Sequence, residues 1–477
     1  MSSMNSSSTP MTTSNSSQNE KLSFHDSNND SNNDSNNDSD NERNIENGDS
    51  GLSLKLQEFY DSHTTLNAIH ELLSASSKTP RFVRLNPRYD TQETLKNLTA
   101  EMNIVPKPIS WLDPGLGFYS IDGGFKLAQS PCFRSGRVYG MDVSSGAAVA
   151  ALLSESCDKA TCKSSLHAES EEFRVLDLCC CPGLKLCAIV DVLESKKKKR
   201  VSVIGVDISK QRLSLCANIV KKYYVNATTS GRSQEDPCNS SVRLYHANGV
   251  SFGLNSERNN LVFDSGTAFE DSILAGKRKR MNKSAKAREK KKLRTLMAES
   301  ATNTSTSENC THKIQKFDRI LVDAECSTDG SIKHLQQQLK KSILFGNQGT
   351  APHSLENQSL TDPIQLAKLV ALQKGLIATA FRLLKPGGYL VYSTCSLSTE
   401  QNENVVRWLL ERNLDHAELV PVIFNISSTA VTEGSIAGTV RFLPVLPNED
   451  DHDYFGGGFF LAKIRKKIGI KSLVALS

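Results

Sequence analysis

The 477-residue sequence lacks any uninterrupted run of eighteen apolar residues, which is about the length that a membrane-spanning helix needs. Its first eighteen residues also lack the continuous apolar core of a secretory signal. They are rich in Ser and Thr and free of acids, as in an organelle transit peptide, but they contain no Arg. The sequence therefore predicts neither a membrane-spanning nor a secreted protein, and it disfavours organelle import.

Disulfide and zinc signatures are missing as well, although twelve cysteines are present. Three of them, Cys179, Cys180 and Cys181, are consecutive, and adjacent cysteines make a poor disulfide framework. The pair in "CDKATC", residues 157–162, has no matching second pair at the spacing that zinc sites use. We therefore predict an intracellular, reduced chain without a metal site.

Two common nucleotide-binding signatures are absent from "LDLCCCPGLKLCAI", residues 176–189. The stretch holds one glycine, too few for a dinucleotide fingerprint, and no Gly-Lys-Ser/Thr for a phosphate loop. It does hold Asp177 at the end of a predicted strand, and the next strand, "GVDIS", ends on Asp207. An acid at such a position can accept hydrogen bonds from ribose hydroxyls, which favours an adenosine-type ligand.

The net charge of +5 is unevenly distributed, and outside segments 1–50 and 277–294 the chain is nearly neutral. Residues 1–50 carry nine acids and two bases, whereas residues 277–294 carry eleven bases and one acid. We predict that segment 277–294 grips an RNA backbone or serves as a nuclear address, the alternative being a solvated charged helix.

Composition and periodicity predict the domain organisation. Residues 1–50, with the tandem "SNNDSNNDSNND", bury too little apolar surface to fold and are predicted to be a disordered tail. Residues 51–135 combine a helical run with strand-like runs, which predicts a small α+β module. Residues 136–470 form the main domain, interrupted at about 251–316 by a polar stretch that we interpret as a disordered insertion.

Five strand-like runs alternate with helical runs in the main domain. They are "FRVLDL", "VSVIGVD", "VRLYHA", "FDRILVDA" and "GGYLVYST". This alternation predicts an α/β fold with a doubly wound, mostly parallel sheet. A helix before the fifth run is expected to start at Pro363, capped by Asp362. Ligands bind beyond the carboxyl ends of parallel strands, so the residues there are candidate site residues.

Two cysteines stand at such strand ends. The fourth run leads to Asp323, Glu325 and Cys326, and the fifth run leads to Cys395. A cysteine in a strand is usually a small buried hydrophobe, so core packing is the alternative interpretation. Two thiols and a carboxylate beside a nucleoside site fit nucleophilic chemistry better.

At these residues the sequence resembles the Nop/Sun family of S-adenosylmethionine-dependent RNA cytosine-C5 methyltransferases. The resemblance rests on "DLCCCPGLK", "VDAECS" and "YSTCS" followed by "EQNEN", and it extends to "RFVRLNP", "GRVYGMDVSSGAAV" and "VRFLPVLPNEDDHDYFGGGFFLAKIRKK". It covers roughly residues 80–466 apart from the basic insertion. It implies a Rossmann-like methyltransferase fold in which the module at 51–135 binds RNA.

The resemblance also implies a covalent mechanism. Cys395 would add to C6 of a cytosine so that C5 can attack the sulfonium methyl group, and Cys326 would assist product release. Asp323 would hydrogen-bond the base edge and stabilise the adduct. The target base would have to leave its stack. Lys185 is the candidate positive charge that would favour the Cys395 thiolate.

The implied cofactor is S-adenosylmethionine, and the implied partner is RNA, with tRNA slightly favoured over rRNA. The residues expected to contact the cofactor are Cys179, Cys180, Cys181, Pro182, Gly183, Leu184, Lys185, Asp207, Asn248 and Asp323. The expected compartment is nuclear, nucleolar or cytoplasmic.

Five positions depart from the family pattern, two of which are Cys180 and Cys181 in the first loop, where the family usually has Ala and Gly. Leu184 replaces a glycine and would narrow the cofactor pocket, and Asn248 replaces a common aspartate. Glu325 replaces a proline, and a carboxylate buried beside Cys326 would raise the pKa of that thiol. An alternative hypothesis is therefore a weak or inactive member that binds RNA during ribosome or tRNA assembly. A methyltransferase of proteins or small molecules is a third hypothesis, but it does not explain two strand-end cysteines.

Overall fold

The structure, a computed structural model, describes residues 80–154, 172–196, 200–231, 240–254, 260–269, 316–331, 363–426, 430–444 and 456–468. All of them belong to one unit, residues 50–477. The predicted tail 1–50, the basic segment 277–294 and most of the insertion 251–316 lie outside the described residues.

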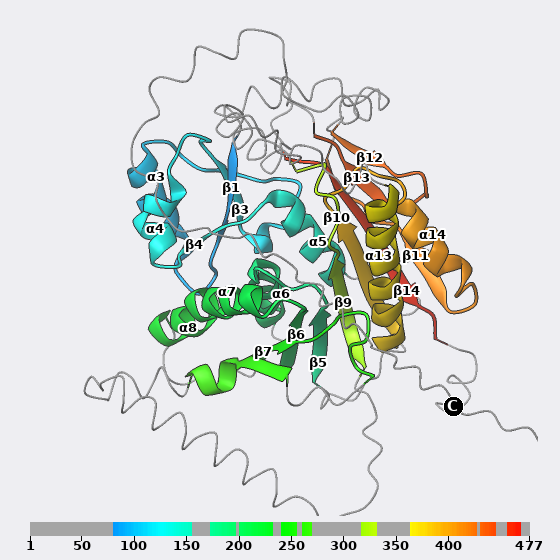
Figure 1. Ribbon diagram of the computed structural model, residues 1–477. Helices are drawn as coiled ribbons and strands as arrows, with labels where there is room; N and C mark the ends of the chain where they lie inside the picture. Colours follow the sequence, from blue (N-terminus) through cyan, green and yellow to red (C-terminus); the bar gives the residue numbers. More distant parts are fainter. Residues whose placement is uncertain are drawn as a thin grey trace, which may run out of the picture. The chain divides into compact units, whose positions relative to one another are not determined.

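Residues 81–140 contain a four-stranded antiparallel sheet (Figure 1). Its strand order is β2 (Lys107–Pro108), β3 (Phe118–Ile121), β1 (Arg81–Leu85), β4 (Val138–Gly140). Helix α3 (Thr91–Met102) begins beside β1, and its cap Asp90 accepts a hydrogen bond from the Glu93 amide at 2.7 Å. The predicted module boundary at 135/136 comes too early, because β4 lies beyond it and pairs with β1. The connecting helices are η2 (Pro114–Leu116), η3 (Leu127–Gln129) and α4 (Pro131–Arg134).

The larger sheet has ten strands, with the path β12-β13-β14-β10-β9-β5-β6-β7-β8 and with β11 paired to β14. The five predicted runs are β5 (Phe173–Asp177), β6 (Val201–Asp207), β7 (Ser240–His246), β9 (Phe317–Asp323) and β10 (Leu384–Thr394). These five strands pair in parallel. The predicted doubly wound, mostly parallel α/β sheet is therefore confirmed.

Antiparallel strands complete both edges of this sheet. They are β8 (Leu261–Asp264), β11 (Ala417–Val420), β12 (Val431–Glu433), β13 (Val440–Phe442) and β14 (Phe459–Lys466). Strand β14 pairs with β10, and β8 pairs with β7. The interpretation of residues 251–316 as a structureless insertion is therefore wrong at β8, which extends the sheet edge.

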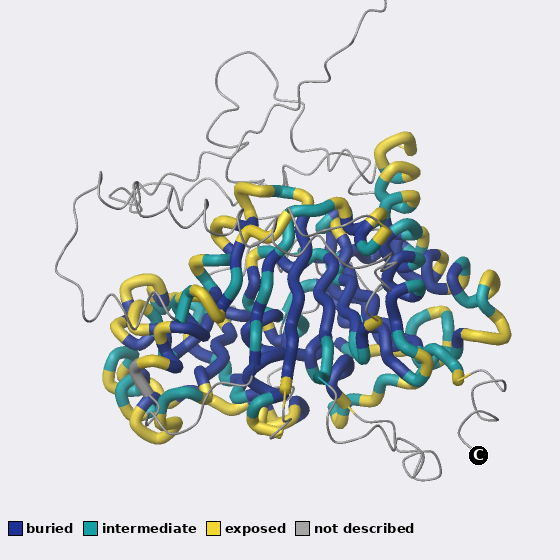
Figure 2. Tube along the Cα trace, turned by 90° about the horizontal axis from the view of Figure 1, so that it is seen from below, coloured by how far each residue is buried: buried dark blue, intermediate teal, exposed yellow. Residues whose placement is uncertain are grey.

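Helices cover both faces of the larger sheet (Figure 1). Helices α5 (Val143–Leu153), α6 (Leu184–Ser195) and α7 (Lys210–Val220) share one core, and α13 (Pro363–Leu383) and α14 (Glu403–Glu411) share the other. Neighbouring strand residues point to opposite faces, so Val175 belongs to the first core and Leu176 to the second. The strands are buried along most of their length (Figure 2). Helix α7 continues as η4 (Lys221–Val225) and α8 (Asn226–Gly231).

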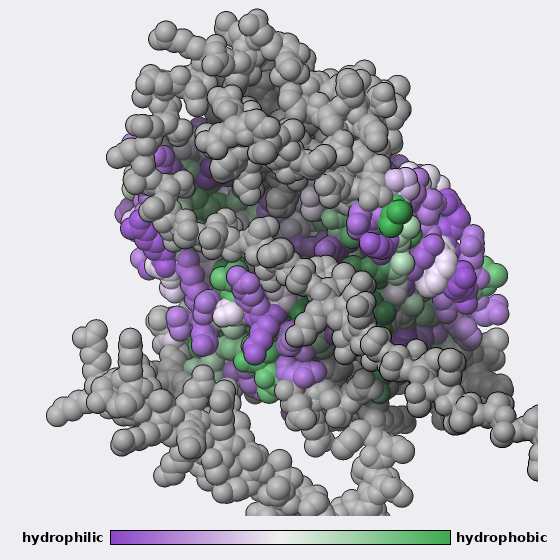
Figure 3. All heavy atoms as spheres, in the orientation of Figure 1, coloured by the Kyte–Doolittle hydropathy of each residue, from purple (hydrophilic) through white to green (hydrophobic). Residues whose placement is uncertain are grey.

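Helix α13 is, among the described helices, the one long and apolar enough to cross a membrane by length and composition, with a mean hydropathy of 1.2. Its described residues start at Pro363, and it buries Leu376, Ile377 and Ala380 in the core of the sheet. The predicted cap Asp362 lies outside the described residues. The described surface around α13 and α14 is mostly hydrophilic, with small groups of hydrophobic atoms (Figure 3). The apolar side of α13 thus forms part of the protein core.

Buried ion pairs fasten the first sheet to α6. Arg84 in β1 donates to Asp191 at 2.7 Å, and both side chains are fully buried. Arg88 pairs with Asp191 and also with Glu194, the latter at 2.9 Å. Tyr139 in β4 donates to Asp191 at 2.8 Å. One carboxylate shared by three donors therefore holds β1 and β4 against this helix.

Candidate active site

The carboxyl ends of β5, β6, β7, β9 and β10 meet at one edge of the larger sheet, because these strands are parallel. The chain runs from β5 outward through β6 to β7 and then returns to β9 on the other side of β5. Ligands of open α/β sheets bind in the crevice beyond such a switch point. Asp177 and Asp323 end the two strands that flank it.

The two strand-end cysteines are in contact. Cys395 follows β10 and Cys326 follows β9, and their sulfur atoms lie 3.3 Å apart. The strand register explains this contact, since Ser393 is paired with Asp323 and the two loops leave the sheet side by side. Both thiols are free and partly buried. Neither thiol is fully buried, and Cys395 also packs against the first core of the sheet.

A buried polar network holds the two cysteine loops together. The side chain of Gln401 accepts a hydrogen bond from the Ser327 amide at 3.1 Å and donates to Ser396 Oγ at 3.0 Å. Asp329 accepts a hydrogen bond from the Leu397 amide at 2.7 Å. The sequence pattern gave these residues no role, although Gln401 is the Gln of "EQNEN". Its side chain positions both thiol-bearing loops.

The carboxylate of Asp323 accepts hydrogen bonds from two side chains. Lys185 Nζ, in the first turn of α6, lies 2.6 Å from one oxygen, and Ser393 Oγ donates to the other at 2.7 Å. Burial opposes the charged form of Lys185, but the carboxylates of Asp323 and Asp177 outweigh it and raise the pKa of Lys185. The site therefore holds a fixed ammonium group whose charge Asp323 compensates.

The prediction of a favoured Cys395 thiolate is wrong for this state of the site. The hydrogen bond with Cys326, followed by burial, raises the pKa of Cys395 well above its ordinary value. The negative charges of Asp323 and Asp329 act in the same direction. Lys185, the expected activating cation, is engaged with Asp323. Cys395 is therefore a protonated thiol at neutral pH until its surroundings change.

Glu325 does not stand where the sequence analysis expected it. The residue is exposed, and its backbone oxygen accepts a hydrogen bond from Gln373 Nε2 at 2.9 Å. The prediction of a buried carboxylate beside Cys326 is therefore wrong. The reason is that β9 ends at Asp323, and the loop that follows turns Glu325 to solvent.

Asp177 is a site residue that the sequence analysis noted at a strand end but did not assign to the cofactor. It is 1% exposed and accepts a hydrogen bond from the Cys179 amide, while its Oδ1 atom has no partner among the described residues. Burial raises the pKa of Asp177 to about 8. An orphaned buried oxygen at the switch point fits a hydrogen-bond donor on a bound ligand.

The loop from β5 to α6 carries most of the predicted cofactor residues and ends at a helix N-terminus. Gly183 caps α6 with φ of 106°, and a Cβ there would lie 2.6 Å from Cys216 Sγ. Glycine is therefore required both by the backbone conformation and by the close approach of α7. Leu184, one of the departures from the family pattern, packs part of its side chain against the core.

Asp207 and Asn248 follow the next two strands and differ in their surroundings. Asp207 is 5% exposed and accepts a hydrogen bond from the Ser209 amide at 2.8 Å. Burial raises the pKa of Asp207 to about 6. Asn248 is exposed, and its side-chain oxygen accepts a hydrogen bond from the Val250 amide at 3.0 Å. Asp207 therefore has the burial of a ligand-binding acid, whereas Asn248 is used in a local turn.

Two surface cavities lie away from these strand ends. One, of about 410 Å³, is lined by Phe125, Lys126 and neighbouring residues of the first module. The other, of about 350 Å³, is lined by residues of α13 and α14 that include Trp408 and Arg412. Neither contains the residues described above, so topology and side-chain chemistry identify the site.

Known protein families and curated relatives match part of this chain. The family described as 16S rRNA methyltransferase RsmB/F matches residues 348–465, which contain Cys395 and Gln401. Ribosomal RNA small subunit methyltransferase F of Shigella flexneri serotype 5b is 37% identical over 163 residues, or 34% of this chain and 28% of the relative. The enzyme of the same name from Klebsiella pneumoniae is 37% identical over 164 residues, with the same coverage. The match thus spans about a quarter of the length of these relatives.

Solved structures share the fold at low sequence identity. NSun6 from Pyrococcus horikoshii, crystallised with SFG, aligns with a TM-score of 0.54 and 15% identity over 88% of this chain and 100% of that chain. A methyltransferase homolog protein from Pyrococcus horikoshii aligns with a TM-score of 0.51 and 20% identity over the same shares. At these identities the likeness establishes the fold, which is the predicted Rossmann-like methyltransferase fold.

Proposed function

We propose that the chain is an RNA methyltransferase of the RsmB/F (Nop/Sun) family that transfers a methyl group from S-adenosylmethionine to C5 of cytosine in RNA. The match of residues 348–465 to the RsmB/F family and the likeness to the curated rRNA methyltransferases support this proposal. The single observation that carries this proposal is the 3.3 Å contact between the sulfur atoms of Cys326 and Cys395. A covalent route through the base needs one thiol that adds, and a second polar group beside it can assist release. Two free thiols on adjacent strand ends meet that need.

S-adenosylmethionine is the cofactor of this family, and it supplies an electrophilic methyl group when bound. The residues of this chain fit it, because the buried Asp177 Oδ1 at the switch point has no hydrogen-bond partner in the part of the chain that the structure describes. In our proposal Asp177, Asp207 and the loop 179–185 hold the cofactor, with Asp177 added to the set expected from sequence. The likeness to NSun6 from Pyrococcus horikoshii, crystallised with the S-adenosylmethionine analogue SFG, supports this cofactor.

Cys395 acts as the nucleophile in this proposal. Its thiol proton leaves, and its sulfur bonds to C6 of a cytosine that has left its stack. The electron pair of the C5–C6 double bond moves to C5, which takes up the methyl group. Asp323 hydrogen-bonds the amino edge of the base and holds it against the sulfur.

Cys326 acts in the second half of the reaction. After methyl transfer, C5 carries both a proton and a methyl group. Transfer of that proton to a water molecule in the partly open site restores the C5–C6 double bond and expels Cys395 as a thiolate. Cys326, whose sulfur starts in contact with Cys395, assists this release.

Binding of the target cytosine also activates the nucleophile. In the resting site, Cys395 is protonated and its sulfur contacts that of Cys326, while Lys185 compensates Asp323. A base that enters between the thiols and engages Asp323 breaks both interactions. The ammonium of Lys185 then stabilises the Cys395 thiolate, because opposite charge favours the ionised form. The Cys395 thiolate therefore forms only when a target cytosine is bound.

The RNA class that we propose is rRNA. The matched family and the curated relatives carry 16S rRNA or small-subunit rRNA in their names, which supports rRNA over the tRNA slightly favoured by the sequence analysis. The first sheet, β1 to β4, is proposed to grip the RNA near the site. A nuclear, nucleolar or cytoplasmic location stays a prediction.

The test is transfer of tritium from labelled S-adenosylmethionine by the full-length protein to unmodified rRNA and tRNA, supplied separately. Cys395→Ala is expected to abolish labelling. Cys326→Ala is expected to accumulate a protein–RNA adduct that survives denaturant. Cys187→Ala is the matched control, since Cys187 is a buried cysteine of α6 outside the site, and it should label RNA as the wild type does.

The other outcomes separate the alternatives. Label that persists in Cys395→Ala would contradict the assigned nucleophile. Absence of label in both RNA pools, together with absence of cofactor binding, would overturn the enzyme and leave an inactive RNA-binding member. Label in tRNA alone would replace the proposed substrate class.

A further inference from the structure

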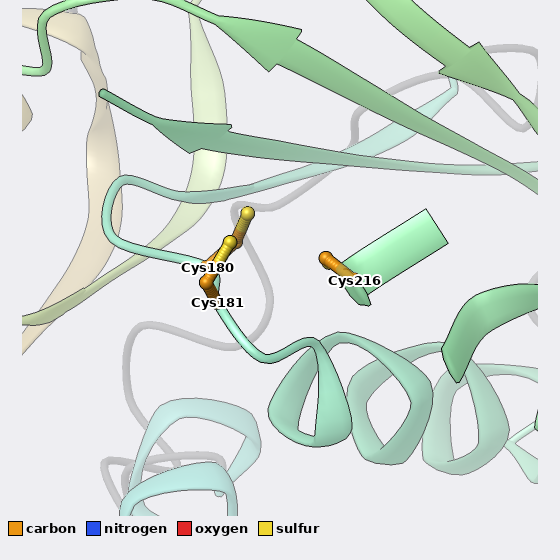
Figure 4. A group of neighbouring side chains, drawn as sticks. All are labelled: Cys180, Cys181 and Cys216. Carbon is orange, nitrogen blue, oxygen red and sulfur yellow. The ribbon is translucent and has the colours of Figure 1, made fainter. Parts of the chain in front are cut away.

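Three cysteines that are far apart in the sequence meet beside the cofactor loop. Cys180 and Cys181 lie in the loop after β5, and Cys216 lies on α7 (Figure 4). Their three sulfur atoms all lie within 4.8 Å of one another. Cys180 and Cys216 are buried, at 3% and 0% exposure, and Cys181 is partly buried. The cluster is therefore a compact, largely dry group of sulfur ligands.

The separation of these sulfur atoms suits a thiophilic metal ion. A zinc–sulfur bond is about 2.3 Å long, which places the sulfur atoms around one ion about 4 Å apart. The two elements that carry the thiols are in close contact, because Gly183 leaves the space that Cys216 Sγ fills. Binding therefore needs only small side-chain rotations.

We propose that Cys180, Cys181 and Cys216 bind one zinc ion. Three thiol protons leave as three zinc–sulfur bonds form, so the bound group carries a net negative charge. Arg212 offsets this charge, since its guanidinium donates to the Cys181 backbone oxygen at 3.4 Å. The fourth zinc position is taken by water or by Asp207, which interacts electrostatically with the Cys181 side chain.

The sequence-based prediction of no metal site relied on ligand spacing along the chain. Cys216 stands 35 residues after Cys181, in a helix with no second cysteine of its own, so no spacing rule indicates it. Only the packing of α7 against the loop brings the third thiol to the other two.

Zinc binding also affects the cofactor loop, and this second part rests on the proposed function. Cys180 and Cys181 belong both to the zinc ligands and to the proposed cofactor set, and Asp207, the alternative fourth ligand, belongs to that cofactor set as well. Zinc that draws them together weakens cofactor binding by about tenfold, the effect of one lost hydrogen bond to a charged group. Zinc would thus act as an inhibitor of the methyltransferase.

The zinc site is tested on the full-length, reduced protein by competition with a chromophoric zinc chelator. The wild type is expected to bind one zinc at this site, and Cys216→Ser is expected to lose it. Cys187→Ser controls for loss of a buried thiol, and Cys157→Ser controls for the "CDKATC" pair. Both controls should keep the zinc. X-ray absorption on the zinc-loaded wild type should show three sulfur neighbours at about 2.3 Å.

Two results would overturn the site. In the first, the wild type fails to take zinc from the chelator. In the second, Cys216→Ser binds as much zinc as the wild type does. If Cys216→Ser fails to fold by circular dichroism, the sulfur count in the wild type decides, and fewer than three sulfur neighbours overturns the proposal. Calorimetry with S-adenosylhomocysteine, with and without zinc, tests the coupling separately. Unchanged cofactor affinity overturns the coupling and leaves the zinc site standing. Cofactor binding that is absent even without zinc counts against the proposed function alone.

Discussion

Lys185 Nζ and the carboxylate of Asp323 lie 2.6 Å apart, joining the first turn of α6 to the end of β9. The pair is partly open to water, with side-chain exposures of 17% and 26%. It places a cation within electrostatic reach of Cys395 and compensates that cation at the same time. In the proposed mechanism, the target cytosine takes the place of Lys185 at Asp323. The Lys185 ammonium then stabilises the Cys395 thiolate.

Lys185→Met is expected to lower the methylation rate by about tenfold or more at neutral pH. Loss of the cation raises the pKa of Cys395 in the substrate complex, so the loss of rate should shrink as the pH rises. The measurement is the pH dependence of kcat for wild type and variant. Lys368→Met, an exposed lysine of α13, is the control and should leave the profile unchanged. A uniform loss at every pH would contradict the electrostatic role.

Asp177→Asn is expected to change the pH dependence of stability. Burial raises the folded-state pKa of Asp177 from 3.8 to about 8, so ionisation is disfavoured in the folded protein. The stability that this group contributes is fully present below about pH 4 and is lost as the pH rises towards 8. Asn does not ionise, so the variant should gain stability relative to wild type across this window, by on the order of a few kcal/mol.

Urea unfolding at several pH values between 4 and 9 measures this difference in the absence of cofactor. Asp415→Asn, which changes an exposed acid, should run parallel to the wild type. A constant offset between Asp177→Asn and wild type at all pH values would show that Asp177 ionises normally.

Gln401→Ala is expected to reduce kcat by about tenfold or more while leaving the cofactor Kd unchanged. The side chain of Gln401 bonds both Ser327 and Ser396, so its loss lets the two thiol-bearing loops move apart. The cofactor residues on the other strands are untouched. Single-turnover kinetics and cofactor calorimetry separate these effects. Asn404→Ala, an exposed change in the first turn of α14, is the control, and a raised cofactor Kd in Gln401→Ala would argue against a purely positioning role.

Much of the fold was predictable because its strands are apolar on both faces. The predicted run 201–207 coincides with β6, which is buried at every position. Strand β8 was missed because its residues lie in a polar stretch, and two of its four residues are exposed. It is a strand only through pairing with β7, which is a long-range contact that local sequence does not encode.

The site was predictable as a set of strand ends but not as a set of protonation states. The sequence indicated Cys326, Cys395 and Asp323, and the sheet register brings them together. It could not indicate that Cys395 is protonated, because that depends on which group the Lys185 ammonium engages. The orphaned oxygen of Asp177 is likewise a product of burial, which only the packed structure shows.

Asp191→Ala is expected to destabilise the protein by about 3–5 kcal/mol, the cost of leaving buried cationic partners unpaired. Arg84 and Arg88 both depend on this carboxylate, and Arg84 is fully buried. The measurement is urea unfolding at neutral pH, again with Asp415→Asn as the exposed control. A loss below about 1 kcal/mol would mean that the first sheet is held mainly by apolar contacts.

Helix α6 has its two ends in two different parts of the protein. Lys185 lies in its first turn, and Asp191 and Glu194 near its last turn bind the arginines of the first sheet. Twelve residues make a rod of about 18 Å, which is too short to bend appreciably. In the proposed enzyme, RNA that shifts the first sheet would shift α6 as a rigid body. The Lys185 ammonium at the other end of α6 would then move with it. The rate of methyl transfer would then depend on how the RNA binds the first sheet, at a distance from the target base.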